Sequence, residues 1–169
     1  HFEVKLHWGY WKKESINSLE LLGSDTPGTI AGEGSSFYIL SQNPPATHAP
    51  AILDLQTLYK PSLELLRYEV NRMLHNHQLQ HDDIDFLLLG EDGDQRRSKP
   101  YELLRAQFPN TPILCFKHLC GEYDTASNFG FWICEQILLR QTVPDFLFHP
   151  SGQHQHKGDI KRILFYNNY

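Results

Sequence analysis

The sequence IDFLLL, residues 84–89, is an apolar run, interrupted only by Asp85, that ends at Gly90. A run of this kind is typical of a strand that is buried on both faces of a parallel sheet. A second run, ILCF at residues 113–116, follows a short helical pattern over residues 100–108. Because a strand, a helix and a strand in this order form a parallel unit, these residues predict the centre of an α/β fold.

Similar patterns extend this unit in both directions along the chain. Apolar residues recur at helical spacing after Pro61 and Ser62. A second apolar helical stretch begins at Thr125. We therefore expect helices layered on a mixed, mostly parallel sheet with right-handed crossovers. The further expected elements are helices over residues 62–78 and 125–139, and strands over residues 37–40, 51–58 and 160–166.

The composition is that of a globular chain. Of the 169 residues, 40% are hydrophobic and 21% are charged, and this length corresponds to about one domain. The formal charge is −5 and no basic run stands out, so we expect no nucleic-acid partner. No apolar stretch suits a membrane span, the start does not look like a signal peptide, and three cysteines are too few for a disulfide framework. We expect a cytoplasmic protein.

Two polar loops follow the predicted central strands, at residues 90–99 and 117–124. Ligands gather at the carboxyl ends of parallel strands, so any chemistry is expected in these loops. The first loop contains Glu91, Asp92 and Asp94, which would suit Mg²⁺ or aspartyl-phosphate chemistry. The other interpretation is a solvated acidic turn that is balanced by the basic residues after it.

The second loop holds four side chains with possible chemistry. Lys117 could orient Glu122 as an acid or base of raised pKa, or the two could form a structural ion pair at a strand end. Cys120 and His118 could form a thiol–imidazole pair. The sequence leaves these interpretations open.

Three further features carry weaker hypotheses. His154 and His156 could bind a transition metal, but no third ligand is evident near them, so a loop pair without metal is favoured. Cys115 and Cys134 fall in apolar elements and are expected to be core thiols. The aromatic residues 8–11, WGYW, could cover a partner subunit or an acyl chain, or pack within the same protein.

Three elements occur in a characteristic order and spacing. They are Ala31-Gly32-Glu33-Gly34-Ser35-Ser36-Phe37, the strand and loop of residues 84–90, and Phe116-Lys117-His118-Leu119-Cys120-Gly121-Glu122 followed by Ala126. Over residues 25–167 they resemble the C-terminal half of a β-ketoacyl synthase of the thiolase-like superfamily. The resemblance implies a thiolase-like half and one C-terminal domain over residues 1–169, which would be a segment of a longer chain.

The resemblance also bears on catalysis. Active members of that family condense an acyl thioester with a malonyl thioester on acyl carrier protein, and two histidines of this half assist decarboxylation and hold the oxyanion. Leu89 and Glu122 stand at those two positions, and Lys117 matches the family's lysine. Loss of one oxyanion donor typically costs on the order of 10²–10³ in rate. Leucine has no donor and a carboxylate repels the oxyanion, so ordinary condensation is not expected.

The resemblance therefore implies a degenerate, non-catalytic partner or scaffold of fatty-acid or polyketide-type biosynthesis, similar to chain-length-factor subunits. It would form a homodimer, or a heterodimer with a ketosynthase subunit, and would bind acyl carrier protein and acyl thioesters. The resemblance implies no cofactor, no metal and no membrane span. The alternative is an acyltransferase or thioester hydrolase that uses Lys117, Glu122 and Cys120. That alternative requires the three side chains to converge on an enclosed pocket. Phosphoryl transfer at Asp92 and Asp94 is a distant third.

Overall fold

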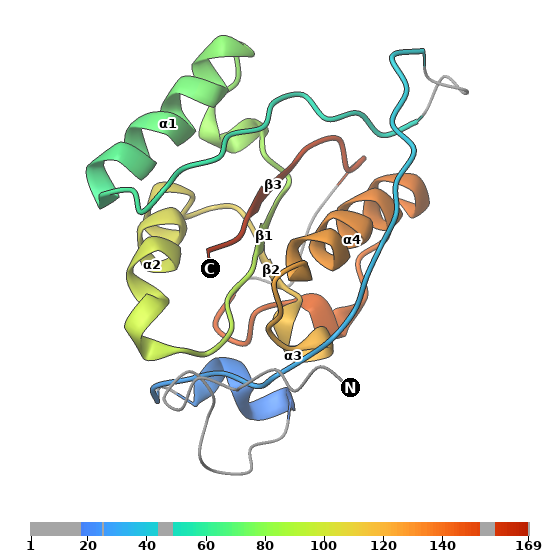
Figure 1. Ribbon diagram of the computed structural model, residues 1–169. Helices are drawn as coiled ribbons and strands as arrows, with labels where there is room; N and C mark the ends of the chain where they lie inside the picture. The colour runs from blue at the N-terminus through green and yellow to red at the C-terminus, as the bar shows by residue number, and fades with distance from the viewer. Residues whose placement is uncertain (1–17, 25, 44–48, 153–157, 169) are drawn as a thin grey trace.

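A three-stranded parallel sheet lies at the centre of the computed structural model, which describes residues 18–24, 26–43, 49–152 and 158–168 (Figure 1). The strand order is β2-β1-β3, so β1 has a neighbour on each side. Leu88 pairs with Leu114 of β2 and with Phe165 of β3. The strands are β1 (Phe86–Leu89), β2 (Ile113–Cys115) and β3 (Ile163–Tyr166).

Helices cover both faces of this sheet, with α1 and α2 on one side and α4 on the other (Figure 1). Short 3-10 helices lie at Ser18–Gly23, His81–Asp83, Gln95–Arg97 and Asp145–Leu147. The α/β class is thereby confirmed, and the described strand pairs are all parallel. The helices are α1 (Leu63–Asn76), α2 (Ser98–Gln107), α3 (Lys117–Cys120) and α4 (Ala126–Arg140).

The apolar run at residues 84–89 forms the central strand because both of its faces are covered. Alternate side chains of a strand point to opposite faces. Leu87 and Leu89 pack in the core under α1 and α2, whereas Phe86 and Leu88 pack in the core under α4. Full burial of one such side chain stabilises the fold by about 1.5–3 kcal/mol. The prediction of a strand buried on both faces is confirmed.

The helix starts follow local chemistry. The Ser62 hydroxyl accepts a hydrogen bond from the Leu65 backbone N–H at 3.1 Å, which caps α1 as the sequence predicts. Thr125 precedes α4 as expected, but its hydroxyl donates to the Gly34 carbonyl at 3.1 Å and does not cap the helix. That hydrogen bond ties the start of α4 to the glycine-containing segment of residues 32–34.

The strands predicted at residues 37–40 and 51–58 are wrong. The chain there has no strand pairing, although the β-branched and aromatic pattern is typical of a strand. Tyr38 points toward α4, where its hydroxyl donates to the Asn128 carbonyl at 2.6 Å. Phe37 and Ile39 on either side of it are 95% and 100% exposed. The pattern is therefore present in the sequence, but no described strand lies beside these residues to complete a ladder.

Candidate functional site

The loops that follow β1 and β2 meet at the carboxyl edge of the sheet, as the sequence predicts. Lys117 Nζ donates to Glu122 Oε2. Arg97 reaches across from the other loop, with Nη2 2.7 Å from Asp92 Oδ2 and Nη1 3.9 Å from Glu122 Oε2. Lys117, Glu122 and Asp92 are all buried. We refer to Asp92, Arg97, Lys117 and Glu122 as the charge network, in which two cations and two carboxylates alternate.

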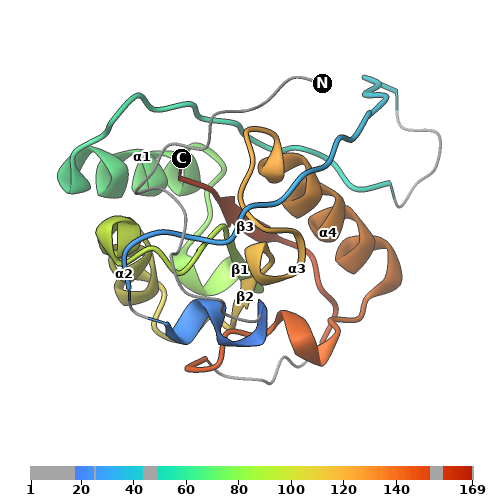
Figure 2. The same ribbon diagram turned by 60° about the horizontal axis from the view of Figure 1, so that its bottom comes forward.

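A segment from the N-terminal part of the chain closes over the charge network. This strap, residues 26–34, runs from beside α2 past α3 (Figure 2). Ala31 forms a parallel bridge with Glu122, where the Glu122 N–H donates to the Ile30 carbonyl at 2.8 Å. The buried Thr29 hydroxyl donates to the Asp92 carbonyl at 2.7 Å. The strap therefore holds both loops at once.

Close backbone approach between the strap and α3 requires glycine. A Cβ atom on Gly32 would lie 1.8 Å from the Cys120 carbonyl oxygen, and one on Gly121 would lie 2.7 Å from the Gly32 nitrogen. Gly121 also has φ +72°, a conformation that side chains rarely adopt. The backbones of the strap and α3 therefore pack directly against each other at Gly32 and Gly121.

Burial sets the electrostatics of the Lys117–Glu122 pair. It raises the pKa of Glu122 to about 7, although the Lys117 ammonium opposes the shift. Burial also lowers the pKa of Lys117. Each charged form is costly away from water, and the two partners offset that cost for each other. The geometry supports the interpretation as a structural ion pair, because the strap covers both side chains.

Cys120 and His118, the other two candidate residues of this loop, contact different partners. The Cys120 thiol donates to the Gly121 carbonyl at 3.3 Å, and burial raises the pKa of this thiol to about 11. His118 Nε2 lies 2.8 Å from the Phe146 carbonyl oxygen, so this ring nitrogen donates there. A protonated thiol is a poor nucleophile, and the contacts of these side chains do not support a site built from Lys117, Glu122 and Cys120.

Leu89 lies in a different environment from Glu122. It is the last residue of β1, it is 0% exposed, and it packs in the core with Tyr101 and Cys115. Glu122 contacts Lys117 and Arg97 instead. The structure thus buries both positions that the resemblance would assign to histidines, one among apolar side chains and one among charges.

The acidic residues of the first loop are paired with arginines. Asp94 Oδ2 lies 2.7 Å from Arg96 Nη2, just as Asp92 pairs with Arg97. Against the effect of burial, the hydrogen bonds from Arg96 and from backbone N–H groups lower the pKa of Asp94 to about 2. The acidic turn is therefore balanced by basic residues, as one interpretation predicts, but it is buried and not solvated. These pairings leave little support for a magnesium site at Asp92 and Asp94.

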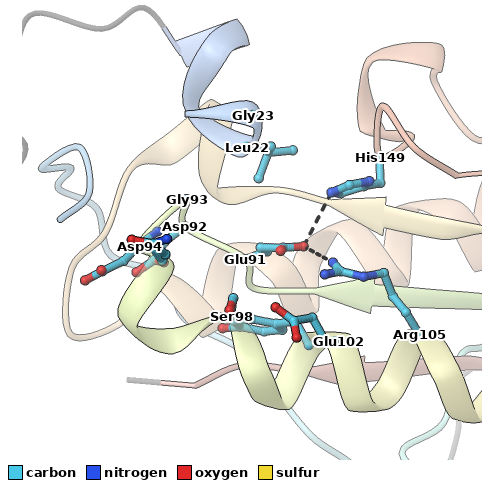
Figure 3. Close-up of a pocket in the computed structure, with 12 residues that line it drawn as sticks. Leu22, Gly23, Glu91, Asp92, Gly93, Asp94, Ser98, Glu102, Arg105 and His149 are labelled. Carbon is cyan, nitrogen blue, oxygen red and sulfur yellow. Dashed lines mark hydrogen bonds and ion pairs between the residues drawn. The ribbon is translucent and has the colours of Figure 1, made fainter. Parts of the chain in front are cut away.

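A pocket of about 200 Å³ opens beside this loop, between Leu22 and helix α2 (Figure 3). Glu91 forms its inner wall, with Oε2 2.6 Å from Arg105 Nη1 and 3.5 Å from His149 Nε2. Sequence reasoning missed Arg105 and His149, because each comes from another element and no local motif marks either one. Lys117, Glu122 and Cys120 are not among the residues that line this pocket.

One group of potential metal ligands lies at this pocket. Glu91, Cys115 and His149 each offer a ligand atom, and these atoms all lie within 4.8 Å of one another. Cys115 and Cys134 are both buried thiols, as predicted. Residues 8–11 and the pair His154 and His156 lie outside the described residues, so their hypotheses stay predictions.

Comparisons with known proteins leave the family open. In the described parts of the chain, no helix combines the length and the apolar character that a membrane crossing requires. The sequence matches no protein-family model and no curated protein, and no solved structure matches the fold.

Proposed function

We propose that this chain is a ketosynthase-like half without ordinary condensing activity, which acts as a partner or scaffold in acyl-thioester chemistry of the fatty-acid or polyketide type. The observation that carries the proposal is the state of the two family histidine positions. Leu89 is fully buried among apolar side chains, and the Glu122 carboxylate is bound by Lys117. Leucine has no hydrogen-bond donor, and the Glu122 side chain is buried and engaged by Lys117.

The contacts between the motifs support the resemblance. The strap carries the Gly-Glu-Gly element, and it touches the element that begins at Lys117 through Gly32 and Gly121. The element of residues 84–90 ends at Gly90, where a Cβ atom would lie 1.9 Å from Oδ1 of the Asn167 side chain. Gly32 and Gly121 thus bring two motifs that are far apart in the sequence into close backbone contact, where a side chain would not fit.

The electrostatics of the charge network support the absence of condensing activity. An oxyanion needs donors that are aimed at it and are not already engaged. Here the Lys117 ammonium is directed at Glu122, and Arg97 is directed at Asp92. Both cations of the network are thus directed at carboxylates and not at a position where an oxyanion could develop.

The exposed apolar side chains after the strap support a role as a partner. Phe37, Ile39, Leu55 and Tyr59 are 95%, 100%, 77% and 87% exposed. Large exposed apolar side chains are typical of protein–protein interfaces. We assign the apolar surface of residues 37–43 and 49–59 to contact with a ketosynthase subunit or with a second ketosynthase-like half.

Two assays test the proposal. The first measures malonyl decarboxylation and condensation on acyl carrier protein, by the purified chain alone and together with an active ketosynthase subunit. We expect turnover only when the active subunit is present, and robust turnover by the chain alone would overturn the proposal. The second measures complex formation with that subunit by light scattering.

The variant Ile39→Asp should abolish the complex, because it places a charge at a fully exposed apolar position of this surface. Gln42→Asp is the matched control, since Gln42 is an exposed polar residue three positions further along the same segment. We expect it to bind like the unmodified chain. Equal binding by Ile39→Asp and the control would exclude this surface as the interface.

A further inference from the structure

Glu91, Cys115 and His149 are brought together by three separate elements. Glu91 follows β1, Cys115 ends β2, and His149 follows the 3-10 helix Asp145–Leu147. The His149 N–H donates to the Ile113 carbonyl at 2.9 Å, next to an antiparallel bridge between Leu114 and Phe148. This pairing fixes the His149 backbone against β2. The three candidate ligand residues therefore lie on the sheet, or on a segment hydrogen-bonded to it. Rigid elements of this kind hold the ligands of a site in a precise geometry.

The donor set selects the kind of metal. A thiolate, an imidazole and a carboxylate are the ligands that Zn²⁺ takes, whereas Mg²⁺ and Ca²⁺ take oxygen ligands. Zinc bonds of about 2.0–2.3 Å place neighbouring ligand atoms roughly 3.5 Å apart in a tetrahedron. The ligand atoms of this cluster already lie within 4.8 Å of one another, so small side-chain rotations close the site.

We propose that Glu91, Cys115 and His149 bind one Zn²⁺ ion at the inner wall of the pocket. This site is independent of the proposed function, because neither the charge network nor the apolar surface contributes a ligand. The pocket borders Glu91 and His149 and has a volume of about 200 Å³ (Figure 3). It leaves a fourth position for water or a small anionic ligand. Three protein ligands and one open position are typical of reactive zinc sites.

The hydrogen bonds around the cluster define how protons move when the metal binds. His149 Nδ1 accepts the Ser151 N–H at 3.1 Å, so in the metal-free protein the ring proton lies on Nε2. Zinc at Nε2 moves this proton to Nδ1, which then donates to the Ser151 hydroxyl oxygen, 2.8 Å away, and the Ser151 N–H gives up its hydrogen bond to this ring nitrogen. The Cys115 thiol loses its proton to solvent. The thiolate and the Glu91 carboxylate then balance the two charges of the ion.

Arg105 positions the carboxylate ligand. Its Nη1 lies 2.6 Å from Glu91 Oε2, which orients the carboxylate beside His149, whose Nε2 lies 3.5 Å from the same oxygen. Hydrogen-bonded groups behind a ligand typically change metal affinity by about 10–100-fold. Ser151 has the same role for His149, and its hydroxyl supplies a specific test.

The test is a titration of the purified chain with Co²⁺, which replaces zinc and reports thiolate ligation by a charge-transfer band in the near ultraviolet. We expect a band that saturates at one equivalent and disappears when Zn²⁺ is added. Cys115→Ser and His149→Gln should remove or shift it. Cys134→Ser is the matched control, because Cys134 is a buried thiol in the core under α4 and should leave the band unchanged.

Two further measurements keep the test decisive. Ser151→Ala should weaken Co²⁺ binding by about 10–100-fold without loss of the fold. Nitrogen NMR of His149 should show the proton on Nε2 without metal and on Nδ1 with Zn²⁺. A band that survives both His149→Gln and Ser151→Ala but is lost in the double variant His154→Ala/His156→Ala would overturn the proposal. Absence of any band at one equivalent of Co²⁺ would overturn it as well.

Discussion

Replacement of Lys117 by methionine tests the charge network directly. Lys117 is 0% exposed and its ammonium group is bound to Glu122, which is 1% exposed. Methionine keeps most of the aliphatic volume of lysine, so the substitution removes a charge and leaves the packing nearly intact. The variant therefore retains a buried carboxylate that has lost its closest cation.

The expected cost follows from the burial of the pair. Removal of one partner from a buried ion pair destabilises a protein by about 3–5 kcal/mol. A whole domain is stabilised by only about 5–15 kcal/mol, so Lys117→Met should bring the chain close to unfolding. The cost depends on pH, because Glu122 can avoid an uncompensated charge by binding a proton.

The free energy of unfolding depends on pH through the protonation of Glu122. Burial raises the pKa of Glu122 from 4.5 to about 7, so the folded chain holds a proton in this window that the unfolded chain has released. The contribution of Glu122 to stability thus decreases as the pH rises from 4.5 to 7, by about 3 kcal/mol. Loss of Lys117 raises this pKa further and extends the decrease above pH 7. The variant should be least destabilised near pH 6 and most destabilised near pH 8.5.

The assay is urea unfolding at these two pH values, followed by circular dichroism. Lys99→Met is the matched control, since Lys99 is an exposed lysine on α2. The double variant Lys117→Met/Glu122→Gln should be more stable than the sum of the two single effects, by about 1–3 kcal/mol. A cost below about 1 kcal/mol, or an equal cost at both pH values, would refute the reasoning.

Three other substitutions test separate features by thermal or denaturant unfolding. Ser62→Ala removes the cap of α1 and should cost about 1 kcal/mol; no change would mean that the cap is dispensable. Gly32→Ala places a Cβ atom 1.8 Å from the Cys120 carbonyl oxygen and should cost about 3 kcal/mol, whereas Gly23→Ala, with nothing within 4 Å, should have little effect. The pKa of Asp94 is held at about 2, so the unmodified chain should lose about 2 kcal/mol as the pH falls from 4 to 2; Asp94→Asn should abolish that loss.

The centre of the fold could be predicted because burial leaves a strong pattern in the sequence. Residues 84–89 are apolar at nearly every position, since both faces of β1 are covered. The helical spacing behind Ser62 predicts α1 because only one face of that helix is buried. The meeting of the two loops was also predictable, because parallel strands end at the same edge of a sheet.

The remainder depends on contacts that no local pattern encodes. Residues 37–40 have a strand-like composition, but a strand also requires a neighbour, and none is described there. The pairing of the acidic loop with arginines was one of two open interpretations, and its burial was missed because the strap comes from far along the chain. His149 was missed because the antiparallel bridge at Phe148, and not its own sequence, brings it to Glu91.

The central place of β1 has a consequence for biosynthesis. Strand β2 follows β1 closely along the chain, so the first half of the ladder forms soon after both have left the ribosome. The other edge of β1 must wait for Ile163–Tyr166, which emerges much later. An unpaired apolar edge is a site for aggregation while synthesis continues. The open edge of β1 is therefore exposed to intermolecular pairing until β3 has been synthesised.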